Sequence, residues 1–197
     1  MARFKILLLV CVGSIFLLSG CATFQKETVG PYSRTSLLQF YKLTQWTFGG
    51  RVAITGQKDS WWANISWEHN ADKDLIRLSG PLGQGATVIR LTGDMVTVDR
   101  GNGDVQSSVQ PDVFVSQQVG ITVPVQSLRY WVLGLPEPTQ VFEENGSGFK
   151  QSGWQVEYKQ MQPVDNQAMP RKITVMNEQV KLKLIIDQWA FNDSYAK

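Results

Sequence analysis

The sequence has little of the chemistry on which most enzymes depend. Its 197 residues contain one histidine, His69, and two cysteines, Cys11 and Cys21. An enzyme needs groups that can move protons, attack carbonyls or hold a metal ion. The one histidine lies in the segment His69–Asp72 (HNAD), which is typical of a turn. We therefore interpret His69 as a solvated or turn-capping residue, and the sequence predicts no catalytic residue and no metal site.

Other signatures of enzymes are also missing. The glycine-rich segments Gly80–Gly85 and Gly101–Gly103 do not have the spacing of dinucleotide-binding or phosphate-binding loops. The carboxylates of Asp72–Asp74 and Glu143–Glu144 fall in predicted turns, where charged side chains are usually solvated. The sequence therefore disfavours an enzyme, and no cofactor is expected.

An excess of charge is absent once the first 20 residues are set aside. The formal net charge of +2 corresponds to Arg3 and Lys5, because residues 1–20 contain no acidic side chain. Subtracting these two from the 19 basic residues leaves 17, which equals the 17 acidic residues. A chain that is neutral overall gives no electrostatic argument for binding nucleic acid or an anionic membrane surface. No nucleic-acid partner is expected.

The first 20 residues have the pattern of a bacterial signal peptide. Arg3 and Lys5 precede the apolar run Ile6–Leu18, whose 13 residues are too few to span a bilayer. The segment Leu18–Cys21 (LSGC) resembles the lipobox, at which bacterial lipoproteins are acylated and cleaved. We predict a signal peptide over residues 1–20, S-diacylglycerol and N-acyl groups on Cys21, and a flexible tether over residues 21–33. Because Cys11 is lost with the leader, no disulfide is expected.

Apolar and polar residues alternate over much of residues 34–197. Trp46, Phe48, Val52 and Ile54, for example, fall on one face of a strand. This period of two predicts strands over residues 46–55, 61–68, 75–79, 86–92, 95–100, 105–109, 154–161, 172–176 and 179–189. Helices are predicted over residues 34–45, 111–120 and 124–134, and the last two each have proline near the start and glycine at the end. The predicted fold is mainly β (α+β): one curved, unclosed antiparallel β half-barrel with about three helices on its apolar face.

The predicted inner face of this sheet is rich in aromatic and aliphatic side chains, among them most of the seven tryptophans. An open curved sheet that is covered by a few helices is difficult to fill, and such half-barrels leave space for an apolar ligand. We predict an apolar cavity for acyl chains, lined by Phe48, Val52, Ile65, Trp67, Leu78, Trp131, Leu135, Trp154, Val156, Leu182 and Leu184. In the alternative interpretation, these residues form an ordinary core.

The segment Gly80–Gly85 (GPLGQG) connects two predicted strands and carries one large apolar residue, Leu82. Pro81 and Gly83 on either side of Leu82 prevent regular structure. Two interpretations are open: Leu82 folds back onto the core, or it points outward as an apolar probe for lipid.

Several motifs, taken in their order and spacing, resemble the LolB family of outer-membrane lipoproteins. The similarity extends over residues 37–189 and rests on Trp46-x-x-x-Gly50-Arg51-Val52-Ala53-Ile54, Ile65-Ser66-Trp67, Pro81-Leu82-Gly83, Leu128-Arg129-Tyr130-Trp131-Val132-Leu133-Gly134-Leu135-Pro136, Ala168-Met169-Pro170 and Val180-Lys181-Leu182-Lys183-Leu184. The resemblance implies an unclosed half-barrel over an apolar cavity, with helices as a lid. It also implies that Leu82, with Pro81 and Gly83, forms a protruding loop that delivers lipoproteins to the membrane.

The resemblance further implies a monomeric lipoprotein on the periplasmic face of a Gram-negative outer membrane. It would accept cargo lipoproteins from a LolA-like carrier by binding their acyl chains, and insert them into outer-membrane phospholipid without a nucleotide. Ala22 follows the predicted acylated cysteine, where an aspartate typically retains lipoproteins at the inner membrane. Two alternatives are a structural envelope lipoprotein whose sheet is filled, and an enzyme acting on acyl chains, which the missing nucleophile and base disfavour.

Overall fold

One antiparallel sheet makes up most of the structure. The computed structural model describes residues 29–57, 60–80, 85–101, 103–119 and 124–191. Within these ranges, eleven strands are arranged in the order β6-β5-β4-β3-β2-β1-β11-β10-β9-β8-β7. They are β1 (Gln45–Thr55), β2 (Ser60–Asn70), β3 (Lys73–Ser79), β4 (Thr87–Thr92), β5 (Met95–Asp99), β6 (Val105–Ser108), β7 (Phe142–Glu144), β8 (Gly148–Gln151), β9 (Trp154–Val164), β10 (Gln167–Met176) and β11 (Lys181–Phe191). The end strands β6 and β7 do not pair with each other, which confirms the predicted unclosed sheet.

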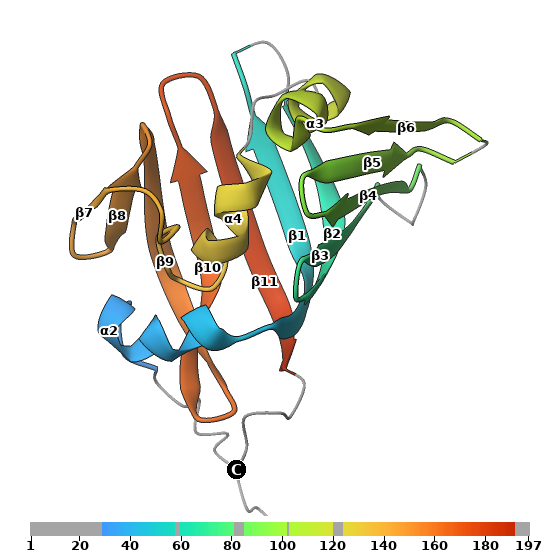
Figure 1. Ribbon diagram of the computed structural model, residues 1–197. Helices are drawn as coiled ribbons and strands as arrows, with labels where there is room; N and C mark the ends of the chain where they lie inside the picture. Colours follow the sequence, from blue (N-terminus) through green and yellow to red (C-terminus); the bar gives the residue numbers. More distant parts are fainter. Residues whose placement is uncertain (1–28, 58–59, 81–84, 102, 120–123, 192–197) are drawn as a thin grey trace, which may run out of the picture.

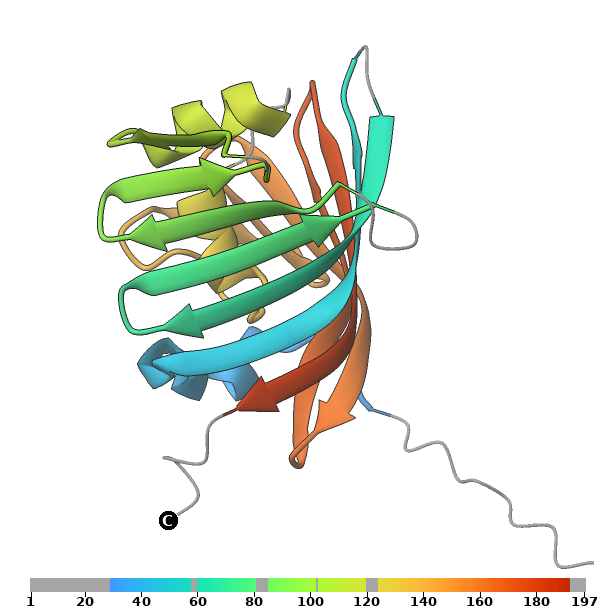
Figure 2. The same cartoon turned by 90° about the vertical axis from the view of Figure 1, so that its right-hand side faces the viewer.

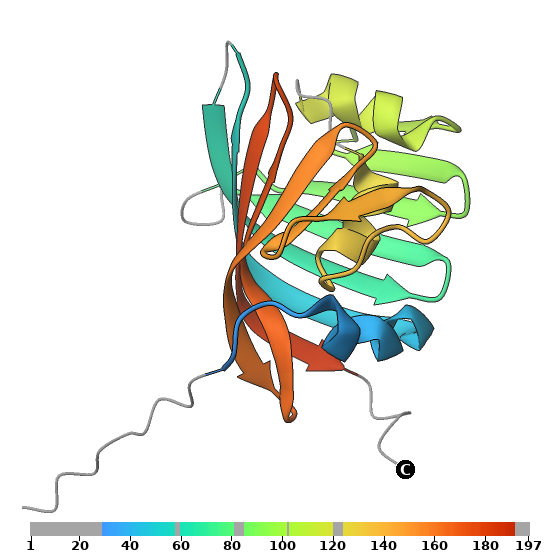
Figure 3. The same cartoon turned by 90° about the vertical axis from the view of Figure 1, so that its left-hand side faces the viewer.

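The sheet is strongly curved, and the helices lie on its concave side (Figure 1). They are α2 (Arg34–Leu37), η2 (Leu38–Lys42), α3 (Pro111–Val119) and α4 (Val125–Trp131). Figures 2 and 3, which view the molecule from opposite sides, show no described helix on the convex side. The predicted half-barrel with helices on one face is therefore confirmed.

A β-bulge in the central strand contributes to the curvature. The pairing of β1 with β11 shifts register between Gly49 and Gly50, so that Gly49 lies opposite Gln188 and Gly50 opposite Ile186. A Cβ atom at Gly50 would lie 2.1 Å from the main-chain oxygen of Ile185, so only glycine allows this close approach. A bulge bends its strand and increases the local twist, which turns a flat sheet into a half-barrel.

The first helical segment is shorter and tighter than the helix predicted over residues 34–45. After the four residues of α2, the chain continues as the 3₁₀ helix η2, and Leu43 is already extended. Because residues three apart share a face in a 3₁₀ helix, Leu37 and Phe40 are both buried while Leu38 and Tyr41 stay exposed. The prediction was wrong beyond Lys42, since β1 begins at Gln45.

Three features of the second half of the sheet were not predicted. β7 and β8 are only three and four residues long, too short for a clear alternation. β10 begins at Gln167, five residues before the predicted start, and contains Pro170. The register between β9 and β10 shifts between Pro170 and Lys172, so the proline lies at a bulge, where its missing N–H group is tolerated in a strand.

The alternation along the central strands has the predicted direction. Trp46, Phe48, Val52 and Ile54 are buried, whereas Arg51 and Thr55 on the opposite face of β1 are exposed. On β11, Leu182, Leu184 and Ile186 are buried between the exposed residues Lys181, Lys183 and Asp187. The concave face of these two strands therefore belongs to the core, and their convex face carries their charged residues.

Candidate functional site on the concave face

A group of aromatic rings forms the centre of the concave face. Trp46 and Phe48 from β1 stack with their ring centroids 5.9 Å apart, and Trp67 from β2 lies 5.5 Å from Trp46. Trp189 from β11 meets the edge of Phe48 at 5.3 Å. Period-two alternation brings these rings together, because the register places Phe48 opposite both Trp67 and Trp189. The result is an apolar surface that extends across three strands.

Helix α4 covers this side of the sheet with three buried apolar side chains, those of Val125, Leu128 and Trp131. Trp131 has an exposed fraction of 0%, and its indole Nε1 donates a hydrogen bond to Oε1 of Gln151, 2.8 Å away. The Tyr158 hydroxyl donates to the main-chain oxygen of Trp131 at 2.8 Å. Burial raises the pKa of this hydroxyl well above its ordinary value, so it stays protonated and remains a donor.

The N-terminus of α4 is capped from a different helix. Pro124 precedes α4 and supplies no side-chain cap. Instead, Oδ1 of Asp112 in α3 accepts a hydrogen bond from the main-chain N–H of Val125 at 2.9 Å. Burial raises the pKa of the Asp112 carboxyl, although its hydrogen bonds to Gln126 and Val125 act in the opposite direction. The two helices over the sheet are therefore linked, and each helps to position the other.

The chain after α4 reverses at Gly134 and packs against the N-terminal helical segment. Gly134 has a φ of +87°, and a Cβ atom there would lie 2.3 Å from Cδ1 of Leu37. Its main-chain oxygen accepts a hydrogen bond from the Tyr32 hydroxyl at 3.0 Å. Both the backbone conformation and the close contact require glycine at this position. This turn joins α2, α4 and the residues before α2 into one covering layer.

A buried polar cluster connects α4 to the β2–β3 hairpin. The carboxylate of Asp74, which is 3% exposed, accepts hydrogen bonds from Trp67 Nε1 at 2.9 Å, and its Oδ1 lies 2.8 Å from His69 Nδ1. Oδ2 of Asp74 pairs with the guanidinium group of Arg129 from α4. Burial alone would raise the pKa of Asp74, but the hydrogen bond from His69 and the charge of Arg129 hold that pKa below its usual range.

This cluster overturns two predictions from the sequence. His69 is 8% exposed and belongs to β2, so it is not a solvated turn residue. Asp74 belongs to β3 and is buried, so it is not a solvated turn charge. The turn consists of Ala71 and Asp72 alone, and the pairing of His69 with Asp74 across the hairpin turns both side chains inward. Sequence reasoning missed Arg129 as their partner because it lies 55 residues from Asp74.

The predicted cavity-lining residues lie together on or above the concave face, but most of them are covered. Nine are buried, with exposed fractions between 0% and 8%: Phe48, Val52, Trp67, Trp131, Leu135, Trp154, Val156, Leu182 and Leu184. Ile65 and Leu78 are half-buried and pack against the same core. A side chain with an exposed fraction near zero has almost no surface that a water molecule can touch. A ligand can therefore reach these nine buried side chains only if neighbouring groups move.

Three pockets lined by described residues lie around this core. The first, of about 180 Å³, lies under η2 beside Trp46, His69 and Arg129. The second, of about 260 Å³, lies where β2 extends beyond the end of β3, and Trp61, Ala63 and Leu78 are among its lining residues. Leu78 is the one residue of the predicted lining that any of these three pockets contains.

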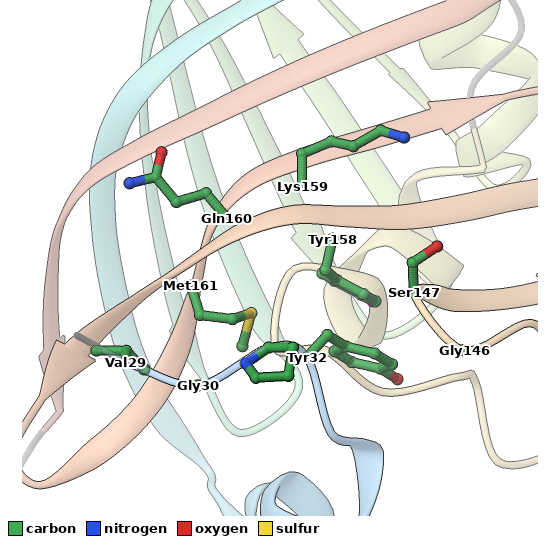
Figure 4. Close-up of a pocket in the computed structure, with 10 residues that line it drawn as sticks. Val29, Gly30, Tyr32, Gly146, Ser147, Tyr158, Lys159, Gln160 and Met161 are labelled. Carbon is green, nitrogen blue, oxygen red and sulfur yellow. The ribbon is translucent and has the colours of Figure 1, made fainter.

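The third pocket, of about 390 Å³, lies between residues 29–32 and β9, beyond the end of β8 (Figure 4). Tyr32 stacks on Tyr158 in this pocket, with ring centroids 4.2 Å apart, and Met161 lies beside them. None of the predicted lining residues borders it. This pocket therefore belongs to the attachment of the N-terminal segment and lies apart from the aromatic concave face.

The predicted delivery loop and lipidation site lie outside the described residues. Pro81, Leu82 and Gly83 fall in the gap between Gly80 and Gly85, and Cys21 precedes Val29. Among the described residues, no helix is long and apolar enough to cross a membrane. In the same part of the chain, no group of three or more His, Cys, Asp or Glu side chains is arranged to hold a metal ion.

The matching family model and the similar sequences name the same family. The family model described as outer membrane lipoprotein LolB matches residues 44–189. An outer-membrane lipoprotein LolB from Chromohalobacter salexigens is 30% identical over 186 residues, which cover 89% of this chain and 86% of that protein. Another of the same name, from Pseudomonas fluorescens, is 32% identical, over 89% of this chain and 91% of that protein. Among solved structures, a LolA superfamily protein from Nitrosomonas europaea aligns with a TM-score of 0.49 and 7% identity, over 83% of this chain and 95% of that chain.

Proposed function

The chain belongs to the LolB family of outer-membrane lipoproteins, and from this premise we propose that it receives lipoproteins from a LolA-like periplasmic carrier and inserts them into the outer membrane. Members of this family are transport proteins of the outer membrane and not enzymes. The proposed reaction is therefore the transfer of an intact lipidated protein, in which no covalent bond of the cargo changes.

The observation that carries this proposal is the aromatic and aliphatic concave face beneath α4. Acyl chains have no polar groups to recognise, so their binding site needs a large apolar surface and shielding from water. Phe48, Trp67 and Leu184 are examples of the side chains that supply such a surface, at the centre of the curved sheet. In this proposal, the eleven residues predicted from the sequence contact the acyl chains of the cargo.

Entry of an acyl chain requires that α4 moves. Trp131 has no exposed surface, and the side chains beneath it are covered by their neighbours. We infer that α4 and the turn at Gly134 act as a lid that is displaced when cargo arrives. The pair between Arg129 and Asp74 then acts as the closing contact, since it connects the lid to the β2–β3 hairpin.

The direction of transfer follows from differences in affinity between the carrier, this protein and the bilayer. A tenfold step in affinity corresponds to about 1.4 kcal/mol, and burial of one CH₂ group contributes about 0.8 kcal/mol. A difference of two methylene groups in contact with the lining is therefore enough to drive each step. No nucleotide is needed, and cargo acyl chains never have to be free in water.

The proposed anchor is the acylated Cys21. One acyl chain gives only marginal membrane binding, whereas two or more hold a protein stably. The S-diacylglycerol and N-acyl groups predicted on Cys21 supply three chains. The anchor would keep the concave face close to the membrane, where each delivered lipoprotein has only a short distance to travel. In this proposal, Leu82 between Pro81 and Gly83 enters the bilayer during release.

Displacement of a bound fluorescent probe tests the apolar site directly. Residues 22–197, prepared without lipid, should bind a hydrophobic probe that becomes fluorescent in apolar surroundings, and an acylated lipoprotein should displace it. The same lipoprotein without its acyl groups is the matched control and should leave the probe in place. If the probe did not bind saturably, or if both forms of the lipoprotein displaced it equally, the filled-sheet alternative would be favoured.

A further inference from the structure

A large aromatic side chain is exposed on the convex side of the sheet. Trp62 in β2 is 54% exposed, whereas its neighbours Trp61 and Ala63 point to the other face and are more buried. Trp62 borders the pocket of about 260 Å³ together with Ser79, Gly80 and Gly85. These last residues are the two ends of the connection that carries Leu82. Trp62 therefore lies beside both ends of the proposed delivery loop.

Basic side chains lie next to Trp62 on the same face. Ala53 pairs with Trp62 on one side and with Lys183 on the other, so Lys183 is two strands from Trp62, or about 10 Å. Lys181 lies two residues before Lys183 on β11, and Lys172 on β10 pairs with Ile185. All three lysines are exposed, and none of them forms an ion pair within the part of the chain that the structure describes.

The charges around these lysines do not neutralise them. Arg51 and Asp187 on the same face pair with each other at 3.1 Å, which leaves no net charge there. Glu178 in the β10–β11 hairpin is an exposed acid beside the three lysines. Glu157 on β9 lies opposite Thr174, which pairs with Lys183, and its carboxylate forms an ion pair with Lys159. The neutral total charge of residues 21–197 therefore conceals a local excess of positive charge, because the fold gathers lysines on the convex face. The total charge alone gives no argument for an anionic membrane surface, whereas this arrangement of lysines favours one.

The start of the described chain lies on the convex side as well. In Figures 2 and 3 the blue segment at residue 29 lies at the lower end of the sheet and the β1–β2 hairpin at the upper end, and both are on the side away from the helices. Cys21 is eight residues before Val29, and eight residues reach at most about 29 Å when fully extended. A chain anchored at Cys21 can therefore present this side of the sheet to the membrane.

We propose that Trp62, Lys172, Lys181 and Lys183, the convex patch, form a surface that lies against the phosphate groups of outer-membrane phospholipids. Tryptophan favours the headgroup level of a bilayer, and each lysine near an anionic surface strengthens binding about fivefold. The patch would turn the two ends of the delivery loop toward the bilayer, so that Leu82 meets the acyl region. This role in delivery rests on the proposed function, but the contact with phospholipid does not.

Vesicle flotation without cargo or carrier tests the contact. Residues 22–197 contain the whole described fold, which begins at Val29. This form should float with phosphatidylethanolamine vesicles that contain phosphatidylglycerol. The double variant Lys181→Gln/Lys183→Gln should bind these vesicles up to about 25-fold more weakly, and the difference should shrink at high salt. Trp62→Ser should weaken binding to these vesicles and to neutral phosphatidylcholine vesicles alike.

The matched control is Lys42→Gln/Lys73→Gln, which also removes two positive charges. Lys42 is exposed on η2 and Lys73 is exposed at the start of β3. Both lie at the opposite end of the strands from the β1–β2 hairpin. Its binding should stay within about twofold of the parent. Circular dichroism and thermal unfolding establish that every variant is folded, as expected for exposed side chains. If the patch variants bound vesicles as the control does, the proposal would be wrong.

Measuring cargo uptake from a LolA-like carrier on the same variants separates the two proposals. Normal vesicle binding with loss of uptake would show that the patch contacts the carrier protein, which also overturns the phospholipid contact. Weakened vesicle binding with normal uptake and slowed delivery is the expected result. If no form of the protein took up cargo, the proposed function would fail, while the flotation result would still decide the role of the patch.

Discussion

Replacing Arg129 by methionine should loosen α4 from the sheet and leave the Asp74 carboxylate buried without its positive partner. Removing one member of a buried ion pair costs about 3–5 kcal/mol. The side chain of Arg129 is 22% exposed, so solvent screens part of the interaction. His69 and Trp67 still donate to Asp74. We therefore expect the free energy of unfolding at neutral pH to fall by about 2–3 kcal/mol.

The loss of unfolding free energy caused by Arg129→Met should depend on pH. In the parent, the pKa of Asp74 is held below its usual value, so ionised Asp74 stabilises the fold above the unfolded-state pKa of about 3.9. That contribution is lost as the pH falls through the folded-state pKa. In the variant, the positive charge of Arg129 no longer opposes the effect of burial on Asp74, so the pKa of Asp74 rises. Its carboxylate is then protonated at a higher pH than in the parent, so the difference in stability should narrow toward pH 4.

Urea unfolding of both proteins across this pH range measures the effect, and Asp74→Asn with the double variant completes a mutant cycle. Hydrogen exchange should show faster exchange of the α4 amides in Arg129→Met, because the lid opens more often. Arg77→Met is the matched control, since the pair of Arg77 with Glu68 is exposed and should contribute less than about 1 kcal/mol. If Arg129→Met lowered the free energy of unfolding by less than about 0.5 kcal/mol, or by an amount that did not change with pH, the proposed role of this ion pair would be wrong.

Three further changes test separate parts of the structure. Gly134→Ala should lower the free energy of unfolding by about 1–3 kcal/mol in a urea titration, because it combines a positive φ with a clash against Leu37; unchanged stability would mean that this turn is not closely packed. Cys21→Ala should abolish acylation and release the folded protein from membranes in a fractionation assay, and a membrane-bound variant would contradict the lipobox interpretation. Leu82→Glu should keep its stability within about 0.5 kcal/mol and take up cargo from the carrier, but deliver it poorly to liposomes, because a carboxylate resists entry into the acyl region. Unfolding of this variant would instead identify Leu82 as a core residue.

The sheet could be predicted because its information is local. Alternation over Trp46–Thr55 and Lys181–Trp189 predicts a strand with one apolar face, and in both segments the predicted face is buried. β7 and β8 were missed because three or four residues show no periodicity. The early start of β10 was missed because Pro170 indicates the end of a strand unless a bulge accommodates it, and the bulge depends on β9.

The polar parts of the site could not be predicted in the same way. Whether Asp74 is solvated or buried is decided by the register of β2 with β3 and by Arg129, which approaches from a distant helix. The convex patch is also a product of the topology, since β11 returns to pair with β1 and places Lys183 beside Ala53. The roles of Leu82 and of the predicted lining residues remain predictions, and only experiments on cargo transfer test them.

Reconstitution of the complete transfer tests the central claim most directly. A LolA-like carrier loaded with an acylated lipoprotein is mixed with liposomes that hold the lipidated, mature protein in their membranes, without any nucleotide, and insertion of the cargo into the liposomes is followed over time. Our account predicts that insertion depends on this protein and on the acyl groups of the cargo. If the cargo stayed on the carrier, or entered protein-free liposomes at the same rate, the account would be contradicted.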